Sequence, residues 1–143
     1  MTLTVLFLCT GNSCRSQMAE AIVNARYPEW RAFSAGTKPA GYVHLMAMEA
    51  LAEIGIAHSG QSKQIDELPV KDFDLVVTVC DSAAEECPVW PGRAGRRVHH
   101  SFADPSRVEG TPDERMQVFR QVRSEMLNII PELLFDNLVV SKP

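Results

Sequence analysis

The feature that most restricts the fold of this chain is an apolar segment that runs directly into a tight turn and then into a helical pattern. Residues 4–9 read TVLFLC, a nearly continuous apolar stretch typical of a strand buried on both faces of a parallel sheet. The turn GNSCRS follows, and residues 16–27 then carry apolar side chains at mainly helical spacing. This order predicts an α/β fold with the turn at the positive end of a helix.

The alternation of strand and helix patterns continues along the chain. Further strands are expected at residues 31–36, 74–79 and, with a weaker pattern, 97–102. A helix is expected across residues 44–55, with Gly55 as its C-terminal stop. This alternation predicts a single-domain three-layer sandwich, in which a four-stranded parallel sheet is flanked by helices.

The last helix has a well-defined start. Thr111, Pro112 and Glu114 provide a cap, a proline at the first helical position and a glutamate within reach of the cap amide. The helix should extend towards Leu134, and Pro131 predicts a kink or an early end.

Length and charge exclude several classes of protein. At 143 residues the chain suffices for one domain, and we expect residues 1–143 to form it. The 14 Lys and Arg against 18 Asp and Glu give a net charge of -4 without long blocks of one sign, which argues against nucleic-acid binding. No stretch approaches the roughly 18 apolar residues of a membrane span, and residues 4–9 lack a basic leader. We expect a cytoplasmic monomer whose four cysteines stay reduced unless they cycle.

Two cysteines are placed where such folds bind ligands. Ligands of parallel α/β sheets bind at the carboxyl ends of the strands, and Cys9 and Cys80 end the first and third predicted strands. Beyond Cys80, residues 88–97 are expected to form a mobile loop in which Trp90 is exposed.

The turn after Cys9 has the composition of an oxyanion-binding cradle. Gly11 and Asn12 tolerate the positive backbone angles that turn successive amides inward, and the following helix adds its dipole. The guanidinium of Arg15 can clamp two oxygens of a tetrahedral anion. The same groups favour the thiolate of Cys9, and Ser16 can donate a further hydrogen bond. The residues expected to bind the oxyanion are Thr10, Gly11, Asn12, Ser13, Cys14 and Arg15.

The motif CTGNSCRS after an apolar strand, with a later Asp104-Pro105, resembles the low-molecular-weight tyrosine phosphatase superfamily over essentially the whole chain. The resemblance implies that Cys9 attacks the oxyanion centre and that Asp104 protonates the leaving oxygen. Spacing alone does not bring Asp104 to Cys9, so its role as general acid is a geometric expectation. Cys14 is expected to pack within the loop rather than to react.

Cys80 and Cys87 have no role in the chemistry of a phosphatase. With them, the pattern resembles the thioredoxin-coupled arsenate reductases of this superfamily. The resemblance implies that Cys9 forms an adduct with arsenate, that Cys80 attacks Cys9 and releases arsenite, and that Cys87 attacks Cys80. Thioredoxin would then reduce the Cys80–Cys87 disulfide, with no cofactor in the protein. Phosphate or sulfate should mimic arsenate in the cradle.

The spacing of these two cysteines predicts a conformational change. The residues between Cys80 and Cys87 favour a helix, which would hold the two Cα atoms roughly 10 Å apart. A disulfide allows no more than about 7 Å. We therefore expect oxidation to unwind residues 81–87.

Several alternatives remain open at this stage. The chain is also compatible with a tyrosine phosphatase acting on aryl phosphates, or with a non-enzymatic oxyanion or redox sensor. Against the phosphatase, Ser106 stands where tyrosine phosphatases usually carry an aromatic residue after Asp-Pro. Cys80 and Cys87 could also be inert core residues. A zinc site is disfavoured because neither cysteine pair has the short spacing of zinc knuckles.

No metal site is predicted. Some of the resembling reductases bind potassium beside the cradle, and Asn12, Glu20 and Ser34 match that site. The fourth position is Lys63 or Gln64 rather than an aspartate, so either a cation or the Lys63 ammonium can occupy the site near Glu20, and a structural ion pair with Glu20 is the simpler interpretation. His99 and His100 are expected to be structural, and no role is assigned to His44 or His58.

Overall fold

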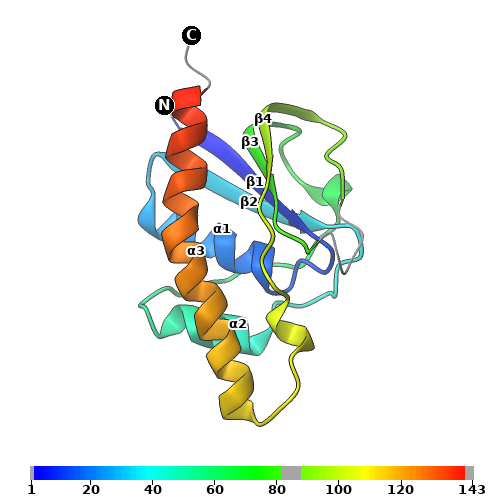
Figure 1. Cartoon of the computed structure of the whole chain (residues 1–143). Helices are drawn as coiled ribbons and strands as arrows, with labels where there is room; N and C mark the ends of the chain where they lie inside the picture. The colour runs from blue at the N-terminus through cyan, green and yellow to red at the C-terminus, as the bar shows by residue number, and fades with distance from the viewer. Residues whose placement is uncertain (1, 82–87, 141–143) are drawn as a thin grey trace.

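The computed structural model describes residues 2–81 and 88–140. The strands are β1 (Leu3–Cys9), β2 (Trp30–Gly36), β3 (Asp72–Thr78) and β4 (Arg93–His99). The helices are α1 (Arg15–Arg26), α2 (Leu45–Ala52) and α3 (Pro112–Val140), with short 3-10 helices η1 (Ile65–Glu67) and η2 (Pro105–Arg107). Figure 1 shows α3 running along the whole height of the molecule beside the sheet.

The four strands form one parallel sheet in the order β2-β1-β3-β4, which confirms the predicted fold class. The chain moves from β1 outward to β2 and then returns to β3 on the other side of β1. The strand order therefore reverses between β1 and β3, and ligands of open α/β sheets bind at such a reversal. Cys9 ends β1 at this place, opposite Gly36 of β2.

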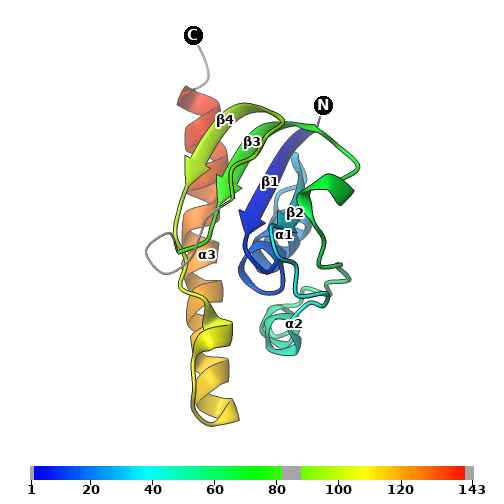
Figure 2. The same ribbon diagram turned by 90° about the vertical axis from the view of Figure 1, so that its right-hand side faces the viewer.

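The helices build the main core on one face of the sheet. Val5 and Phe7 of β1 are fully buried against α1, α2 and α3, as expected for alternate residues of a strand that point to one face. Arg26 of α1 donates to the carbonyl of Ile54, which ties α1 to the turn after α2 at 2.9 Å. Figure 2 shows the same elements from the side.

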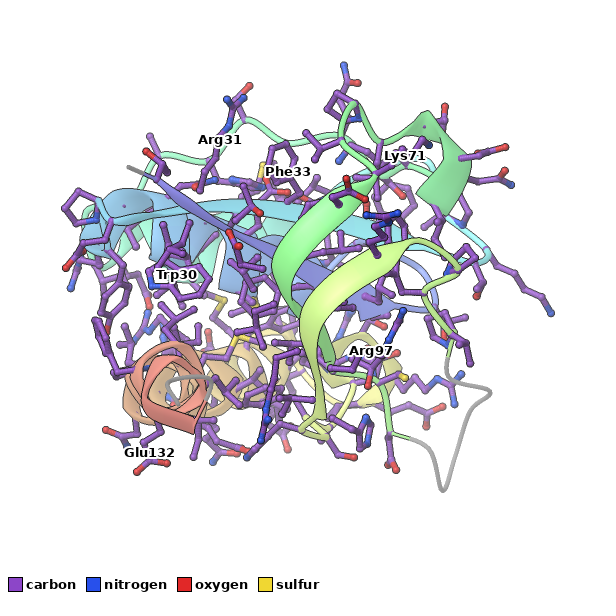
Figure 3. All side chains as sticks on the ribbon, turned by 90° about the horizontal axis from the view of Figure 1, so that it is seen from above. Trp30, Arg31, Phe33, Lys71, Arg97 and Glu132 are labelled. Atoms are coloured by element: carbon purple, nitrogen blue, oxygen red, sulfur yellow. The ribbon has the colours of Figure 1, made fainter. Side chains whose placement is uncertain are left out.

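The opposite face of the sheet has a thinner cover. Leu6 and Leu8 of β1 pack there with Phe73 and Trp90. The remaining described cover comes from η1 and the segment around it. Figure 3 shows α3 beneath the sheet, on the side opposite Phe33 and Lys71. The prediction of an exposed Trp90 was wrong: its side chain is 3% exposed because it fills this thin layer.

Three boundaries differ clearly from expectation. The helix α2 ends at Ala52, three residues before the expected stop at Gly55. The fourth strand begins at Arg93, so the predicted strand at residues 97–102 was placed too late and the loop at 88–97 was too long. The helix α3 continues through Pro131 to Val140, so an early end at the proline was wrong. Ile130 and Leu134 are buried on either side of Pro131 and keep this part of the helix on the core.

The predicted start of α3 is confirmed. The Glu114 amide donates to the Thr111 hydroxyl at 3.1 Å, and the Thr111 amide donates to the Glu114 carboxylate at 3.2 Å. These two bonds satisfy amides that the first helical turn leaves unpaired. No helix in the described part of the chain is long and apolar enough to cross a membrane.

Candidate active site

The sulfur of Cys9 lies at the end of β1 and is surrounded by hydrogen-bond donors. Its side chain is buried. The Asn12 amide donates to the sulfur at 3.2 Å, and the Ser16 hydroxyl lies 2.8 Å from it. Both contacts favour a negatively charged sulfur, because a thiolate accepts hydrogen bonds more strongly than a thiol does.

The direction of the Ser16 hydroxyl proton follows from its second contact. The side-chain NH₂ of Asn12 donates to the Ser16 oxygen at 2.8 Å, so the hydroxyl proton is available for Cys9. The Asn12 side-chain oxygen in turn accepts from Gln17 and from the Lys63 amide, each at 3.0 Å. These two donors fix the Asn12 amide with its NH₂ group towards Ser16. The Ser16 hydroxyl proton is therefore directed towards Cys9.

The backbone of the cradle faces inward because its carbonyl groups are bound on the outside. The carbonyls of Thr10, Gly11 and Ser13 accept from backbone amides of the loop between β2 and α2 at 2.9–3.0 Å. Asn12 has a positive φ of 49°, whereas Gly11 does not adopt a positive φ. The left-handed turn that we expected from Gly11 and Asn12 therefore depends on Asn12 alone, a residue type that tolerates it.

Gly36 is a functional position that the sequence reasoning missed. A Cβ atom at Gly36 would collide with the carbonyl oxygen of Thr10, the first residue of the cradle. The Gly36 amide also donates to the carbonyl of Lys63 at 2.9 Å. Only glycine lets the cradle lie this close to the end of β2. The contact joins segments far apart in sequence, so no local pattern could have indicated it.

The structure brings Asp104 beside Arg15, although 89 residues separate them. The Arg15 guanidinium is buried, lies 3.5 Å from the Asp104 carboxylate, and donates to the carbonyl of Phe102 at 3.4 Å. The other carboxylate oxygen of Asp104 accepts from the Ser106 amide at 3.0 Å and from its hydroxyl at 2.6 Å. The carboxylate is thus held at the edge of the cradle, within reach of an anion bound by Arg15.

Cys14 has the environment of an unreactive thiol. Its side chain is buried at the start of α1, and this burial raises the pKa of the thiol to about 12. The Ser13 hydroxyl, 3.7 Å away, offsets only part of that effect. Cys14 is therefore protonated at neutral pH, and its contribution to the cradle is its backbone.

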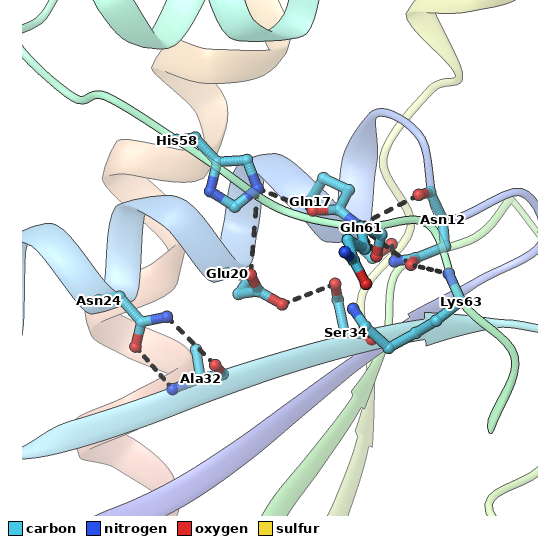
Figure 4. A network of polar contacts seen from close by, with 10 residues as sticks. Asn12, Gln17, Glu20, Asn24, Ala32, Ser34, His58, Gln61 and Lys63 are labelled. Carbon is cyan, nitrogen blue, oxygen red and sulfur yellow. Dashed lines mark hydrogen bonds and ion pairs between the residues drawn. The ribbon is translucent and has the colours of Figure 1, made fainter. Parts of the chain in front are cut away.

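A buried polar network lies behind the cradle (Figure 4). The His58 ring nitrogen lies 2.7 Å from the Gln17 side-chain oxygen, and the Ser34 hydroxyl donates to the Glu20 carboxylate at 2.8 Å. Burial raises the pKa of Glu20, while Ser34 and the charge of Lys63 act in the opposite direction. Burial and the same Lys63 charge lower the pKa of His58.

Lys63 lies near Glu20, at the site that the sequence left open between a cation and this ammonium. Its ammonium donates to the Ser34 carbonyl at 3.3 Å and acts on Glu20 through its charge. Within the described ranges, no group of three or more His, Cys, Asp or Glu side chains is arranged to hold a metal ion. The two histidines near β4 have local contacts: His99 bonds to Thr78, and His100 stacks on Phe102.

Cys80 lies two residues beyond the end of β3, at the same edge of the sheet as Cys9. It is fully buried and disulfide-bonded, whereas Cys9 and Cys14 are free. Cys87, and with it the segment expected to unwind on oxidation, lies outside the described residues. The structure therefore places one of the two predicted relay cysteines at the carboxyl edge.

Comparison with known proteins agrees with this geometry. A family model for the low molecular weight phosphotyrosine protein phosphatases matches residues 4–133. The chain belongs to this family. Within the family, it is 48% identical to an arsenate reductase of Halalkalibacterium halodurans over 125 residues, which are 85% of this chain and 88% of that protein.

Solved structures of the phosphatase family include both kinds of enzyme. The arsenate reductase of Archaeoglobus fulgidus is 32% identical, with a TM-score of 0.67 over 90% of this chain and 99% of that chain. A low molecular weight protein tyrosine phosphatase from T. tengcongensis is 26% identical, with a TM-score of 0.72 over 99% of this chain and 100% of that chain. The fold is thus common to reductases and phosphatases, and the choice between them depends on the site.

Proposed function

We propose that this protein reduces arsenate to arsenite through a thiol relay from Cys9 to Cys80 and Cys87. The observation that carries the proposal is the disulfide-bonded Cys80 at the same sheet edge as the Cys9 cradle. A phosphatase needs the cradle but has no use for a redox-active cysteine beside it. The relatives named arsenate reductase support the same choice.

The first step is attack of the Cys9 thiolate on arsenate. The Asn12 amide and the Ser16 hydroxyl stabilise the thiolate, while Arg15 holds two oxygens of the anion. Attack by sulfur expels one arsenate oxygen, which needs a proton to leave. Asp104, held beside Arg15, is the proposed donor of that proton.

The following steps transfer two electrons to arsenic. Cys80 attacks the Cys9 sulfur, the S–As bond breaks with its electron pair on arsenic, and arsenite leaves. Cys87 then attacks Cys80 and frees Cys9. In sum, H₃AsO₄ and two thiols give H₃AsO₃, one disulfide and water. The proposed reductant of the final disulfide is thioredoxin, in the cytoplasm, where the reducing pool keeps thiols available.

The test is an NADPH-coupled assay with arsenate, thioredoxin and thioredoxin reductase. The wild type should turn over continuously, and Cys87→Ser should release no more than one arsenite per chain. Cys14→Ser is the matched control and should keep multiple turnover, because Cys14 is protonated and buried. Continuous turnover by Cys87→Ser at the wild-type rate would contradict the relay.

A phosphatase remains the second candidate, because the cradle alone suffices for hydrolysis of a phosphate ester and the family model carries that name. It predicts efficient hydrolysis of p-nitrophenyl phosphate by a variant with both Cys80→Ser and Cys87→Ser. Under the reductase proposal the same variant forms no net arsenite.

A further inference from the structure

Gln17 occupies the centre of the polar network behind the cradle (Figure 4). Its side chain lies on α1, is fully buried, and uses both ends of its amide. The NH₂ group donates to the Asn12 side-chain oxygen and to the Gln61 carbonyl, each at 3.0 Å, and to the Asn12 carbonyl at 3.3 Å. Because three acceptor oxygens surround this end of the amide, it must carry the hydrogens.

The orientation of the Gln17 amide decides which ring nitrogen of His58 carries a proton. With its NH₂ group held among three oxygens, the Gln17 side-chain oxygen faces the His58 Nε2 atom at 2.7 Å. An amide oxygen accepts, so Nε2 carries a hydrogen and donates it. The Glu20 carboxylate is further from the same nitrogen, at 4.0 Å. A doubly protonated ring would donate from Nε2 as well, so the contact does not depend on the charge of His58.

Gly60 packs directly against the hydrogen bond between His58 and Gln17. A Cβ atom at Gly60 would collide with both of its ends, the Gln17 side-chain oxygen and the His58 Nε2 atom. The φ angle of Gly60 is not positive, so a methyl group there would act through this collision rather than through backbone strain. The backbone of Gly60 therefore confines the pair from one side.

A continuous series of hydrogen bonds leads from His58 to the sulfur of Cys9. His58 donates to Gln17, and Gln17 donates to the Asn12 side-chain oxygen. Asn12 donates to the Ser16 oxygen at 2.8 Å, and the Ser16 hydroxyl lies 2.8 Å from the Cys9 sulfur. All of these bonds point in the same direction, and neighbouring hydrogen bonds in such a series polarise one another. The hydrogen at its end faces the sulfur.

We propose that His58 and Gln17 are positioning residues that set the nucleophilicity of Cys9 through Asn12 and Ser16. This inference rests on the proposed role of Cys9 as the attacking thiol. Without the His58 donor, the buried Gln17 oxygen loses its hydrogen bond, and the amide turns or moves to find another. The side chain of Asn12 is then less well oriented, and the Ser16 hydroxyl stabilises the thiolate less.

The experiment measures the rate at which iodoacetamide alkylates Cys9 between about pH 5 and pH 9, by mass spectrometry of the Cys9 peptide. Gln17→Met should react about fivefold more slowly than the wild type at pH 7, the equivalent of one ordinary hydrogen bond. His58→Leu should react about threefold more slowly, because Gln17 keeps its other contacts. Both rate profiles should move to higher pH. His58→Gln, which supplies an amide hydrogen in place of Nε2–H, should restore the wild-type profile.

A pair of double variants separates positioning from a general loss of packing. In a protein that carries Ser16→Ala, the hydroxyl through which His58 acts is absent, so the addition of His58→Leu should cause no further slowing. A further slowing of the same size as in the wild-type background would overturn the proposal. Gly60→Ala displaces the His58–Gln17 pair without removing either side chain. It should slow alkylation in the wild-type background and not in the Ser16→Ala background, which keeps the test decisive if His58→Leu folds poorly in circular dichroism.

The matched control is Asn24→Ala. Asn24 lies on the same helix as Gln17, and its side chain accepts from the Ala32 amide at 2.8 Å and donates to the Ala32 carbonyl at 3.1 Å. Its replacement removes two hydrogen bonds between α1 and β2 that do not lead to Cys9. Asn24→Ala should keep the wild-type alkylation profile. Equal slowing in Asn24→Ala and His58→Leu would overturn the proposal, since a loosened α1 would then explain both.

The outcomes also separate this inference from the proposed function. If the wild type still reduces arsenate after complete alkylation of Cys9, then Cys9 is not the nucleophile and both proposals fall. If alkylation abolishes reduction, and His58→Leu and Gln17→Met both keep the wild-type profile, only the positioning role is overturned.

Discussion

The reactivity of Cys9 depends on the orientation of one hydroxyl group. Ser16 stabilises the sulfur only if its proton points to Cys9, and Asn12 enforces this by donating to the Ser16 oxygen. Asn12 is itself oriented by Gln17 and Lys63. The motif indicated Ser16 as a donor. The contact of Lys63 could not be predicted, because it joins the cradle to a loop 51 positions further along the chain, whereas Gln17 lies only five positions from Asn12.

Replacing Ser16 by alanine should slow the reaction of Cys9 with iodoacetamide at pH 7. A hydrogen bond to an ionised group contributes roughly 1.5–3 kcal/mol, so the expected decrease is about ten- to a hundredfold. The rate is measured by mass spectrometry of the Cys9 peptide. Ser13→Ala is the control, because the Ser13 hydroxyl contacts Cys14 rather than Cys9. Equal rates in the two variants would show that Ser16 does not act on the sulfur.

Substitution by alanine is predicted to have opposite effects at Gly36 and at Gly11. A Cβ at Gly36 would collide with the Thr10 carbonyl, whereas a Cβ at Gly11 would meet the Ser13 hydroxyl oxygen at 3.7 Å, an ordinary contact. Gly36→Ala should therefore lower the free energy of unfolding by about 1–3 kcal/mol, as overpacking does, and weaken phosphate binding. Gly11→Ala should leave both the free energy of unfolding and the affinity for phosphate unchanged. Urea denaturation and calorimetric titration with phosphate measure the two effects, and a harmless Gly36→Ala would refute the steric argument.

At the scale of elements, sequence periodicity predicted the strands that bury a continuous apolar pattern, and it was less accurate for the strand at the edge of the sheet. β1 and β3 were found within two residues because they lie inside the sheet. β4 is an edge strand with exposed arginines, so its pattern resembled a loop. The proline in α3 did not end the helix, since the burial of Leu134 offsets the lost backbone hydrogen bond.

The contact between α2 and α3 gives a prediction about stability and pH. Glu53, at the end of α2, accepts from Arg120 and Arg123 of α3 at 2.7 Å, and these hydrogen bonds lower the pKa of its carboxyl from 4.5 to about 2. A lowered pKa in the folded state adds stability above pH 4.5, and this contribution disappears as the pH falls towards about 2.

Glu53→Gln should consequently lower the urea midpoint at pH 7, and its difference from the wild type should shrink between pH 4.5 and about pH 2. Urea denaturation across this pH series is the measurement. Glu49→Gln, an exposed change on the same helix, should leave the midpoint nearly unchanged at every pH. A difference for Glu53→Gln that stays constant down to pH 2 would exclude the ion pair as its cause.

At the scale of the whole molecule, the two faces of the sheet are covered by different kinds of structure. The alternation of strands and helices predicted the parallel sheet, because a crossover connection must pass over one face. It did not predict that α1, α2 and α3 share one core. The opposite face is closed partly by Trp90, whose burial depends on long-range packing that a proline- and glycine-rich sequence does not indicate.

The buried Arg15 connects distant parts of this molecule, so occupation of the cradle should stabilise the whole fold. Its guanidinium joins the start of α1 to Phe102 and Asp104, close to the start of α3. An anion that binds only the folded state at a hundred times its Kd adds about 2.7 kcal/mol, or roughly 6–10 °C in Tm for a chain of this size. Arg15→Met should abolish the rise in Tm with phosphate, whereas Arg31→Met, at an exposed position stacked on Phe33, should keep it. Thermal unfolding in increasing phosphate decides the matter: a persistent rise in Arg15→Met would mean that phosphate binds elsewhere than the cradle.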